Sequence, residues 1–292
     1  MLDSMPSAPS VDALTLGSRT RRVARRVVDL GIPLSGRIGL EHRLLPSVLV
    51  IGAQRCGTTS VHRALAAHPG VVPPRRGKGV HYYDTTAYTR GLAWYRTHFP
   101  VDDGSNLAME SSPCYLFHPA APTRVAADLP DVKLIVVLRD PVQRAISHHR
   151  HEVARGFEDL ALAEALEHED ERLAGAVDLL RHDASAVHDG YLHHSYKARG
   201  RYAEQLERWL QLFAREKICI LDANLMFTDP QPAMESLTKF LGLDTRTPLT
   251  LGHVNGYPDV DVAPDTRAEL TEYFEPHDAR LEALLGWRPS WR

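Results

Sequence analysis

Residues 52–60, GAQRCGTTS, bring together two glycines, one arginine and three hydroxyl side chains between a short apolar run and a helical pattern. Backbone N–H groups at a helix start have no intrahelical partner, and the helix dipole favours an anion there. Glycine lets the backbone approach such an anion closely, and arginine adds a permanent charge with a forked set of donors. We therefore predict a phosphate-binding turn whose residues are Arg55, Cys56, Gly57, Thr58, Thr59 and Ser60.

Two other interpretations of this turn are weaker. The spacing of Gly52 and Gly57 matches the front of the triphosphate-binding loop GxxxxGK[ST], which would indicate a kinase or another NTPase. However, Thr58 stands where the lysine that contacts the β- and γ-phosphates belongs, so a P-loop kinase is kept only as an alternative. A bare strand-to-helix turn without a ligand would not need an arginine together with three hydroxyl groups.

A second candidate anion site follows the apolar run KLIVVL at residues 133–138. Arg139 comes at the carboxyl end of this predicted strand, and Ser147 lies on the helix predicted to begin after Pro141. An arginine and a hydroxyl that converge from a strand end and a helix can bind a second, separate phosphate. The alternative is that Arg139 pairs with Asp140 and that Ser147 is a surface residue.

Together, the two segments resemble the PAPS-dependent sulfotransferases, where PAPS is 3′-phosphoadenosine 5′-phosphosulfate. The similarity is to the 5′-phosphosulfate loop and to the 3′-phosphate strand and helix of that family. It implies that residues 55–60 hold the 5′ end of the nucleotide and that Arg139 and Ser147 hold its 3′-phosphate. It also implies PAPS as the sulfonate donor, PAP as the product and a P-loop-like nucleotide-binding architecture.

Further segments resemble the heparan-type carbohydrate sulfotransferases. They are KGVHYYD at residues 78–84 (KExHFFD in the family), ESSPCY at residues 110–115 (EKxPxY) and residues 200–210 (GxYxxxLxxWL). The likeness covers about residues 47–243. A looser similarity at residues 253–257 implies that Asn255 and Gly256 help to close a loop over the nucleotide.

The chain departs from the family pattern at three positions. Arg55 replaces the lysine of the first loop, which keeps the charge that stabilises the leaving group. Gly79 replaces the glutamate that is the family's general base, and Ser111 replaces a lysine. His81 is our first candidate for the base, because the unperturbed pKa of histidine is near neutrality.

The rest of the predicted catalytic set is held in reserve. Asp84 is a second candidate base or the group that orients His81, and Glu110 is a further candidate base or a ligand of the acceptor hydroxyl. Which residue takes the proton stays open, as does a purely structural role for His81. Because of Gly79 and Ser111, a catalytically inactive module that binds PAPS or PAP is an alternative to an enzyme.

The resemblance implies an in-line reaction, in which the acceptor oxygen attacks sulfur as the phosphate oxygen leaves. Cationic side chains can neutralise the developing charge, so we predict no metal. His148, His149 and His151 have no carboxylate or cysteine at matching spacing, and we expect them at the surface. The expected acceptor is a hydroxyl of a carbohydrate, glycolipid or small natural product, and a phenol stays open.

The elements that must position these residues alternate along the chain. Apolar runs predict strands at residues 47–52, 133–138 and 217–221, and helical periods predict helices at residues 58–68, after 141, through 202–213 and at 234–241. Continuous apolar strands indicate a parallel sheet covered on both faces, with functional loops at the carboxyl ends. We predict one α/β domain, residues 46–292, with a central parallel sheet flanked by helices, after a variable lead-in of residues 1–45.

Composition limits the surroundings of this domain. The net charge of −3 argues against a nucleic-acid partner, and three widely spaced cysteines suit a reducing compartment. The chain shows neither an apolar stretch of about 20 residues nor a secretory signal, so we expect a cytoplasmic, bacterial protein. A basic run predicts a helix packed on the domain, with weak contact to a membrane surface as the alternative: Arg19, Arg21, Arg22, Arg25 and Arg26. The oligomeric state is not indicated.

Overall fold

The computed structural model describes residues 42–104, 106–252 and 262–292. The predicted basic helix around Arg19–Arg26 lies outside the described residues, as do Asn255 and Gly256. Residues Leu40–Arg292 form one compact unit, and the domain boundary expected at residue 46 stays a prediction. Within the described ranges, every helix is too short or too polar to cross a membrane.

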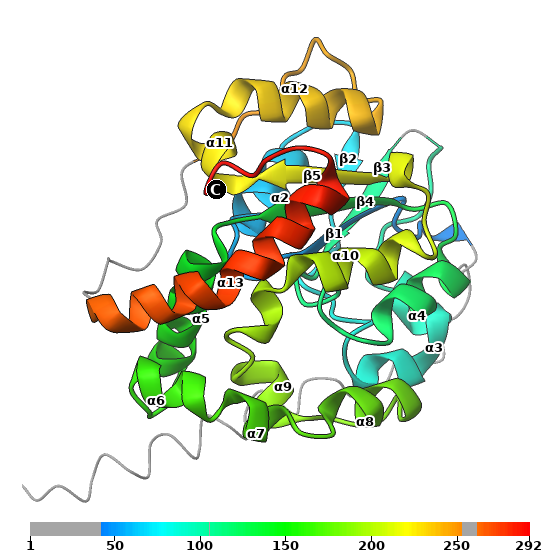
Figure 1. Cartoon of the computed structure of the whole chain (residues 1–292). Coiled ribbons are helices and arrows are strands. Elements are labelled where there is room, and N and C mark those ends of the chain that lie inside the picture. Colours follow the sequence, from blue (N-terminus) through cyan, green and yellow to red (C-terminus); the bar gives the residue numbers. More distant parts are fainter. Residues whose placement is uncertain (1–41, 105, 253–261) are drawn as a thin grey trace, which may run out of the picture. The chain divides into compact units, whose positions relative to one another are not determined.

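The centre of this unit is a five-stranded sheet with the order β2-β3-β1-β4-β5, in which every pair of neighbours is parallel (Figure 1). The strands are β1 (Val48–Gly52), β2 (Val71–Val72), β3 (Leu107–Ser111), β4 (Lys133–Leu138) and β5 (Ile218–Asp222). All five residues of β1 are buried, as expected for a strand covered on both faces. The predicted α/β fold with a central parallel sheet is confirmed.

The register of the sheet decides where the loops meet. Val50 of β1 is level with Ser111 at the end of β3 on one side and with Ile135 of β4 on the other. Parallel strands point the same way, so the segments that leave β1, β3 and β4 emerge at one edge of the sheet. Ligand sites of open α/β sheets lie at this carboxyl edge.

Helices cover the sheet and fill most of the connections. They are α2 (Thr58–Ala66), α3 (Gly91–Arg96), α4 (Ala121–Asp128), α5 (Pro141–Arg155), α6 (Leu162–Glu167), α7 (Glu169–Leu173), α8 (Ala176–His182), α9 (Asp189–His193), α10 (Tyr202–Leu210), α11 (Ala223–Thr228), α12 (Pro230–Leu241) and α13 (Pro264–Leu285). Short 3-10 helices are η4 (Thr86–Arg90), η5 (Ala198–Gly200) and η6 (Arg215–Lys217). The long α13 packs against α10 and α5 (Figure 1).

The predicted boundaries agree with the structure where the local signal is strong. The strand at residues 133–138 is β4, and Pro141 begins α5, with Asp140 as its cap. On α10, Tyr202, Leu206 and Trp209 are buried, as their helical spacing predicts. Neither β3 nor α13 was predicted from the sequence.

Candidate active site

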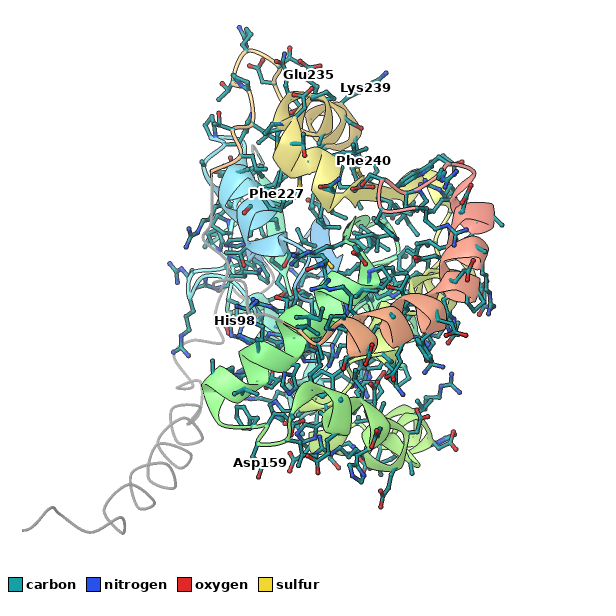
Figure 2. The ribbon with its side chains drawn as sticks, turned by 60° about the vertical axis from the view of Figure 1, so that its left-hand side comes forward. His98, Asp159, Phe227, Glu235, Lys239 and Phe240 are labelled. Atoms are coloured by element: carbon teal, nitrogen blue, oxygen red, sulfur yellow. The ribbon has the colours of Figure 1, made fainter. Side chains whose placement is uncertain are left out.

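The turn between β1 and α2 has the backbone of a narrow anion-binding loop. Gly57 caps α2 with a φ of 92°, and Arg55 before it has a φ of 70°. A Cβ on Gly57 would stand 2.8 Å from the ring of Phe227, which belongs to α11 and lies beside α2 in Figure 2. Only glycine fits such a position, because it combines a left-handed backbone with a close contact. The first N–H groups of a helix have no partner in the preceding turn of helix, which suits this loop to an anion.

The side chain of Cys56 points away from the turn, into the core. The residue is 1% exposed, its Sγ lies 3.6 Å from the hydroxyl of Tyr202, and burial raises the pKa of the thiol. The same Tyr202 hydroxyl donates to the carbonyl of Arg139 at 2.8 Å. Of the residues predicted for the phosphate, Cys56 therefore has only its backbone to offer, and its side chain helps to fix the two loops from below.

Arg55 connects the two predicted anion sites. Its Nε donates a hydrogen bond to Oγ of Ser147 at 3.1 Å, although the residues are 92 positions apart in the chain. The adjacency of β1 and β4 brings them together, because each strand delivers its loop to the same edge. We expected two separate sites, but in the structure one guanidinium spans from the first loop to the helix of the second.

Asp140 caps a helix. Its Oδ1 accepts a hydrogen bond from the backbone N–H of Val142 at 2.8 Å, at the first turn of α5. Arg139 and Ser147 are both half-buried, so Ser147 is not the surface residue of the alternative interpretation. The cap fixes the start of α5 and with it the position of Ser147.

Lys78 is a site residue to which the sequence analysis gave no role. Its Nζ donates to Oγ1 of Thr58 at 3.0 Å and to Oγ1 of Thr59 at 2.8 Å, so a second cation stands at the start of α2. Burial, together with the neighbouring charge of Arg55, lowers the pKa of Lys78 to about 8. The sequence did contain a signal for this role: Thr58 stands where the triphosphate-binding pattern has a lysine, and an anion site that lacks one cation can receive it from another segment.

His81 and Asp84 form a hydrogen-bonded pair three residues beyond Lys78. The distance between Nδ1 of His81 and Oδ2 of Asp84 is 2.8 Å, and the backbone N–H of His81 donates to Oγ of Ser112 at 2.9 Å. Burial alone would lower the pKa of His81, but the charge of Asp84 and this hydrogen bond outweigh burial and raise it to about 10. Of the two roles predicted for Asp84, the geometry favours the one that orients His81.

Gly79 explains how His81 fits. Gly79 has a φ of 88°, and a Cβ there would stand 3.2 Å from Cδ2 and Nε2 of the His81 ring. A side chain at residue 79 would therefore be strained and would press on the imidazole. The position that carries glutamate in the heparan-type pattern therefore has no side chain here, and the ring of His81 lies next to it.

Glu110 is a buried anchor at the end of β3. It is 0% exposed, Oε1 accepts hydrogen bonds from the N–H of Val80 at 3.2 Å and from the hydroxyl of Ser112, and Oε2 accepts one from Tyr95 at 3.2 Å. Burial raises the pKa of its carboxyl. A carboxyl so enclosed cannot reach an acceptor, so the predicted role as base or acceptor ligand does not fit. It fastens residues 78–84 to the sheet instead.

The histidines of α5 are not where we expected them. His148 is 0% and His149 is 9% exposed, so their expected surface position is wrong. Both rings pack on Tyr196. The expectation that no carboxylate stands at matching spacing is also wrong, because Glu152, four residues after His148, lies 3.7 Å from Nε2 of His148 and 2.8 Å from Nδ1 of His193. Helical spacing does not reveal this burial, because α9 and η5 cover α5 from a distant part of the chain.

Comparisons with known proteins agree on one family. A family model described as "Sulfotransferase domain" matches residues 45–253. The sulfotransferase of Alicyclobacillus acidocaldarius has a solved structure that aligns with a TM-score of 0.71 and 30% identity over 85% of this chain and 98% of that one.

Two human proteins of heparan sulfate modification are also similar. Bifunctional heparan sulfate N-deacetylase/N-sulfotransferase 2 is 30% identical over 85% of this chain. Heparan sulfate glucosamine 3-O-sulfotransferase 3B1 is 28% identical over 91% of this chain and 70% of that protein. This chain spans only 31% of the length of the bifunctional protein.

Proposed function

This chain belongs to the sulfotransferase family, and we propose that it moves the sulfonate of PAPS to an acceptor hydroxyl and releases PAP. The observation that carries the proposal is the hydrogen bond from Arg55 to Ser147. It joins the turn after β1 to the helix after β4, so that groups suited to a 5′-phosphosulfate and to a 3′-phosphate face one edge of the sheet. A nucleotide with phosphates at both ends fits such a pair.

The donor side of the site consists of residues 55–60, Lys78, Arg139 and Ser147. Sulfonate transfer breaks the bond between sulfur and the bridging oxygen, and the electron pair stays on the phosphate of PAP. Arg55 and Lys78 stand at the start of α2, where they can neutralise that charge together with the helix N–H groups. Lys78 thereby supplies the lysine that the triphosphate-binding pattern has at the position of Thr58.

The acceptor side consists of His81, Asp84 and Cys114, of which each has a side-chain N, O or S atom within 4.8 Å of those of the other two, with the buried Glu110 as the anchor of residues 78–84. The acceptor oxygen forms the new bond to sulfur, and its proton must pass to a base or to solvent. The ring of His81, oriented by Asp84, is the group we propose for this proton; because its pKa is raised to about 10, it takes the proton in the neutral form, which becomes more populated as the pH rises. His81 follows Lys78 by three residues, which supports a position next to the sulfonate.

For the acceptor we propose first a carbohydrate hydroxyl, with a glycolipid or a small natural product as further members of the class. The name of the 3-O-sulfotransferase relative supports a sugar hydroxyl. The name of the N-sulfotransferase relative indicates transfer to nitrogen, so a glucosamine amine belongs in the acceptor panel beside a phenol.

Three further expectations remain predictions: a cytoplasmic location, membrane contact through residues 19–26 and the lack of a nucleic-acid partner.

Calorimetric titration with 3′,5′-ADP and with ATP tests the nucleotide site. We expect 3′,5′-ADP to bind much more tightly, and Arg139→Ala to lose about 1.5–3 kcal/mol of its binding free energy with the charge-assisted bonds to the 3′-phosphate. Arg246→Ala is the matched control, because this arginine is exposed and pairs with Asp244. Equal affinity for ATP would overturn the proposal in favour of a kinase. Binding of 3′,5′-ADP without transfer from PAPS to any member of the panel would indicate an inactive binding module.

A further inference from the structure

Three metal-binding side chains of the acceptor side lie together. His81, Asp84 and Cys114 each offer one ligand atom, and these atoms all lie within 4.8 Å of one another. His81 and Asp84 come from the segment before η4, and Cys114 comes from the turn that follows β3. In the described ranges, no other group of three histidine, cysteine or acidic side chains meets in this way.

Asp84 provides a second, independent indication of a ligand. The residue is 6% exposed, and while Oδ2 contacts His81, Oδ1 is buried without a hydrogen-bond partner among the described residues. A buried carboxylate oxygen without a partner is unfavourable, because it has lost its water and gained nothing in exchange. A cation bound beside it would supply the missing interaction.

The chemistry of the three donors selects the metal. Thiolate, imidazole and carboxylate together suit a borderline ion such as zinc, whereas magnesium and calcium prefer oxygen ligands alone. We propose that His81, Asp84 and Cys114 form a binding site for one zinc ion. With three protein ligands, the fourth position of a tetrahedral zinc stays open to water or to an acceptor oxygen, as in catalytic rather than structural zinc sites.

The charges and the exposure of the three side chains are compatible with a zinc ion. The thiolate of Cys114 and the carboxylate of Asp84 together balance the two positive charges of zinc. The loaded site would therefore carry no net charge and would not repel the nearby cations, Lys78 beside Cys114 and Arg124 beside Asp84. Tetrahedral zinc needs its ligand atoms about 3–4 Å apart, so the three atoms must move closer by a small amount. The side chain of His81 is 38% exposed and Cys114 is half-buried, which leaves them room to do so.

Zinc binding would change what His81 can do. A ring nitrogen that ligates zinc cannot accept a proton, so zinc bound to that nitrogen would compete with the acceptor's proton for His81. Only this consequence of the inference rests on the proposed function, which assigns the acceptor's proton to His81. The existence of the site does not depend on it, and zinc binding can be measured without any transfer reaction.

The experiment is a zinc titration of the metal-free full-length chain in competition with a chromophoric chelator at neutral pH. We expect one tightly bound zinc per chain, and at least a roughly tenfold weaker affinity in Cys114→Ser and in Asp84→Asn, since each removes one of three protein ligands. Cys219→Ser is the matched control, because Cys219 is buried in β5 away from the cluster. Cobalt(II) in place of zinc should give a thiolate charge-transfer band that disappears in Cys114→Ser.

Titration with 3′,5′-ADP accompanies each variant and reports whether the fold and the nucleotide site are intact. Loss of zinc in Cys114→Ser with unchanged 3′,5′-ADP binding supports the site. If the wild-type chain binds no zinc, or if Cys114→Ser binds it as tightly as the wild type, the inference is wrong. An equal loss in Cys219→Ser would also overturn it, because the binding would then not be specific to Cys114. Failure of the proposed function would appear instead as weak 3′,5′-ADP binding in every protein.

Discussion

The proposed donor side and the proposed acceptor side of this site are built by different means. On the donor side, two strand ends and two helix starts carry the important groups, and the sheet order β2-β3-β1-β4-β5 brings them to one edge. On the acceptor side, a loop whose backbone N–H groups donate to the side chains of Glu110, Ser112 and Tyr115 presents a few side chains. The donor side is therefore a property of the fold, while the acceptor side depends on individual residues such as Gly79, His81 and Cys114.

Replacement of His81 should give the largest effect and should separate the two sides most clearly. We expect His81→Ala to reduce the rate of sulfonate transfer by roughly 10²–10⁴-fold, the usual contribution of a general acid–base group, and to leave 3′,5′-ADP affinity unchanged. The measurement is steady-state transfer from PAPS together with calorimetry. His182→Ala, at an exposed position on α8, is the control. A parallel loss of nucleotide affinity would show that the two sides are not separable.

Lys78 should give an intermediate effect with a pH dependence of its own. Lys78→Ala should weaken 3′,5′-ADP binding by about tenfold or more, as expected for a lost charge-assisted bond to phosphate. In the wild type, burial and Arg55 hold the pKa of Lys78 at about 8, so the ammonium is present below that pH and is lost above it. Affinity should therefore decline as the pH rises through 8.

Lys78→Arg provides the control, because arginine stays charged throughout this range. Its affinity for 3′,5′-ADP should not decline between neutral pH and pH about 9.5, well below the pKa of a guanidinium. If the wild type and Lys78→Arg decline alike, another group is responsible and the placement of Lys78 on the donor side is wrong.

The helix cap at Asp140 should give the smallest effect. Asp140→Ala removes the acceptor of the Val142 N–H and should lower the free energy of unfolding by about 1 kcal/mol. Asp131→Ala, at an exposed position whose carboxyl pairs with Lys217, is the control. Thermal and urea unfolding measure both. No difference between the variants would mean that the start of α5 is fixed by the sheet alone.

The sequence predicts the donor side better than the acceptor side for physical reasons. The strand β4 is a continuous apolar run, and Pro141 marks a helix start, so both ends of the Arg139 segment are readable locally. The strand β3, LAMES, has no β-branched residue and carries a charged residue, Glu110, next to its end, so neither the strand nor the burial of Glu110 was predicted.

Other features depend on long-range packing that no local pattern records. The contact of Lys78 with Thr58 and Thr59 spans about 20 residues, and the direction of the Cys56 side chain is set by Tyr202, far along the chain. The resemblance to known motifs indicated which segments meet, but not which atoms touch. The hydrogen bond from Arg55 to Ser147 likewise depends on long-range packing and could not be predicted from a local pattern.

The segment from Lys78 to His81 contributes one residue to the proposed donor side and one to the proposed acceptor side. Its first residue bonds to the hydroxyls at the start of α2, and its last is paired with Asp84, with only two residues between them. A nucleotide that draws Lys78 toward its phosphates pulls on the same short stretch of backbone that holds the imidazole. We therefore expect the proposed nucleotide and acceptor to affect each other's binding through this segment, and by thermodynamic linkage the factor by which the nucleotide changes acceptor affinity equals the factor by which the acceptor changes nucleotide affinity.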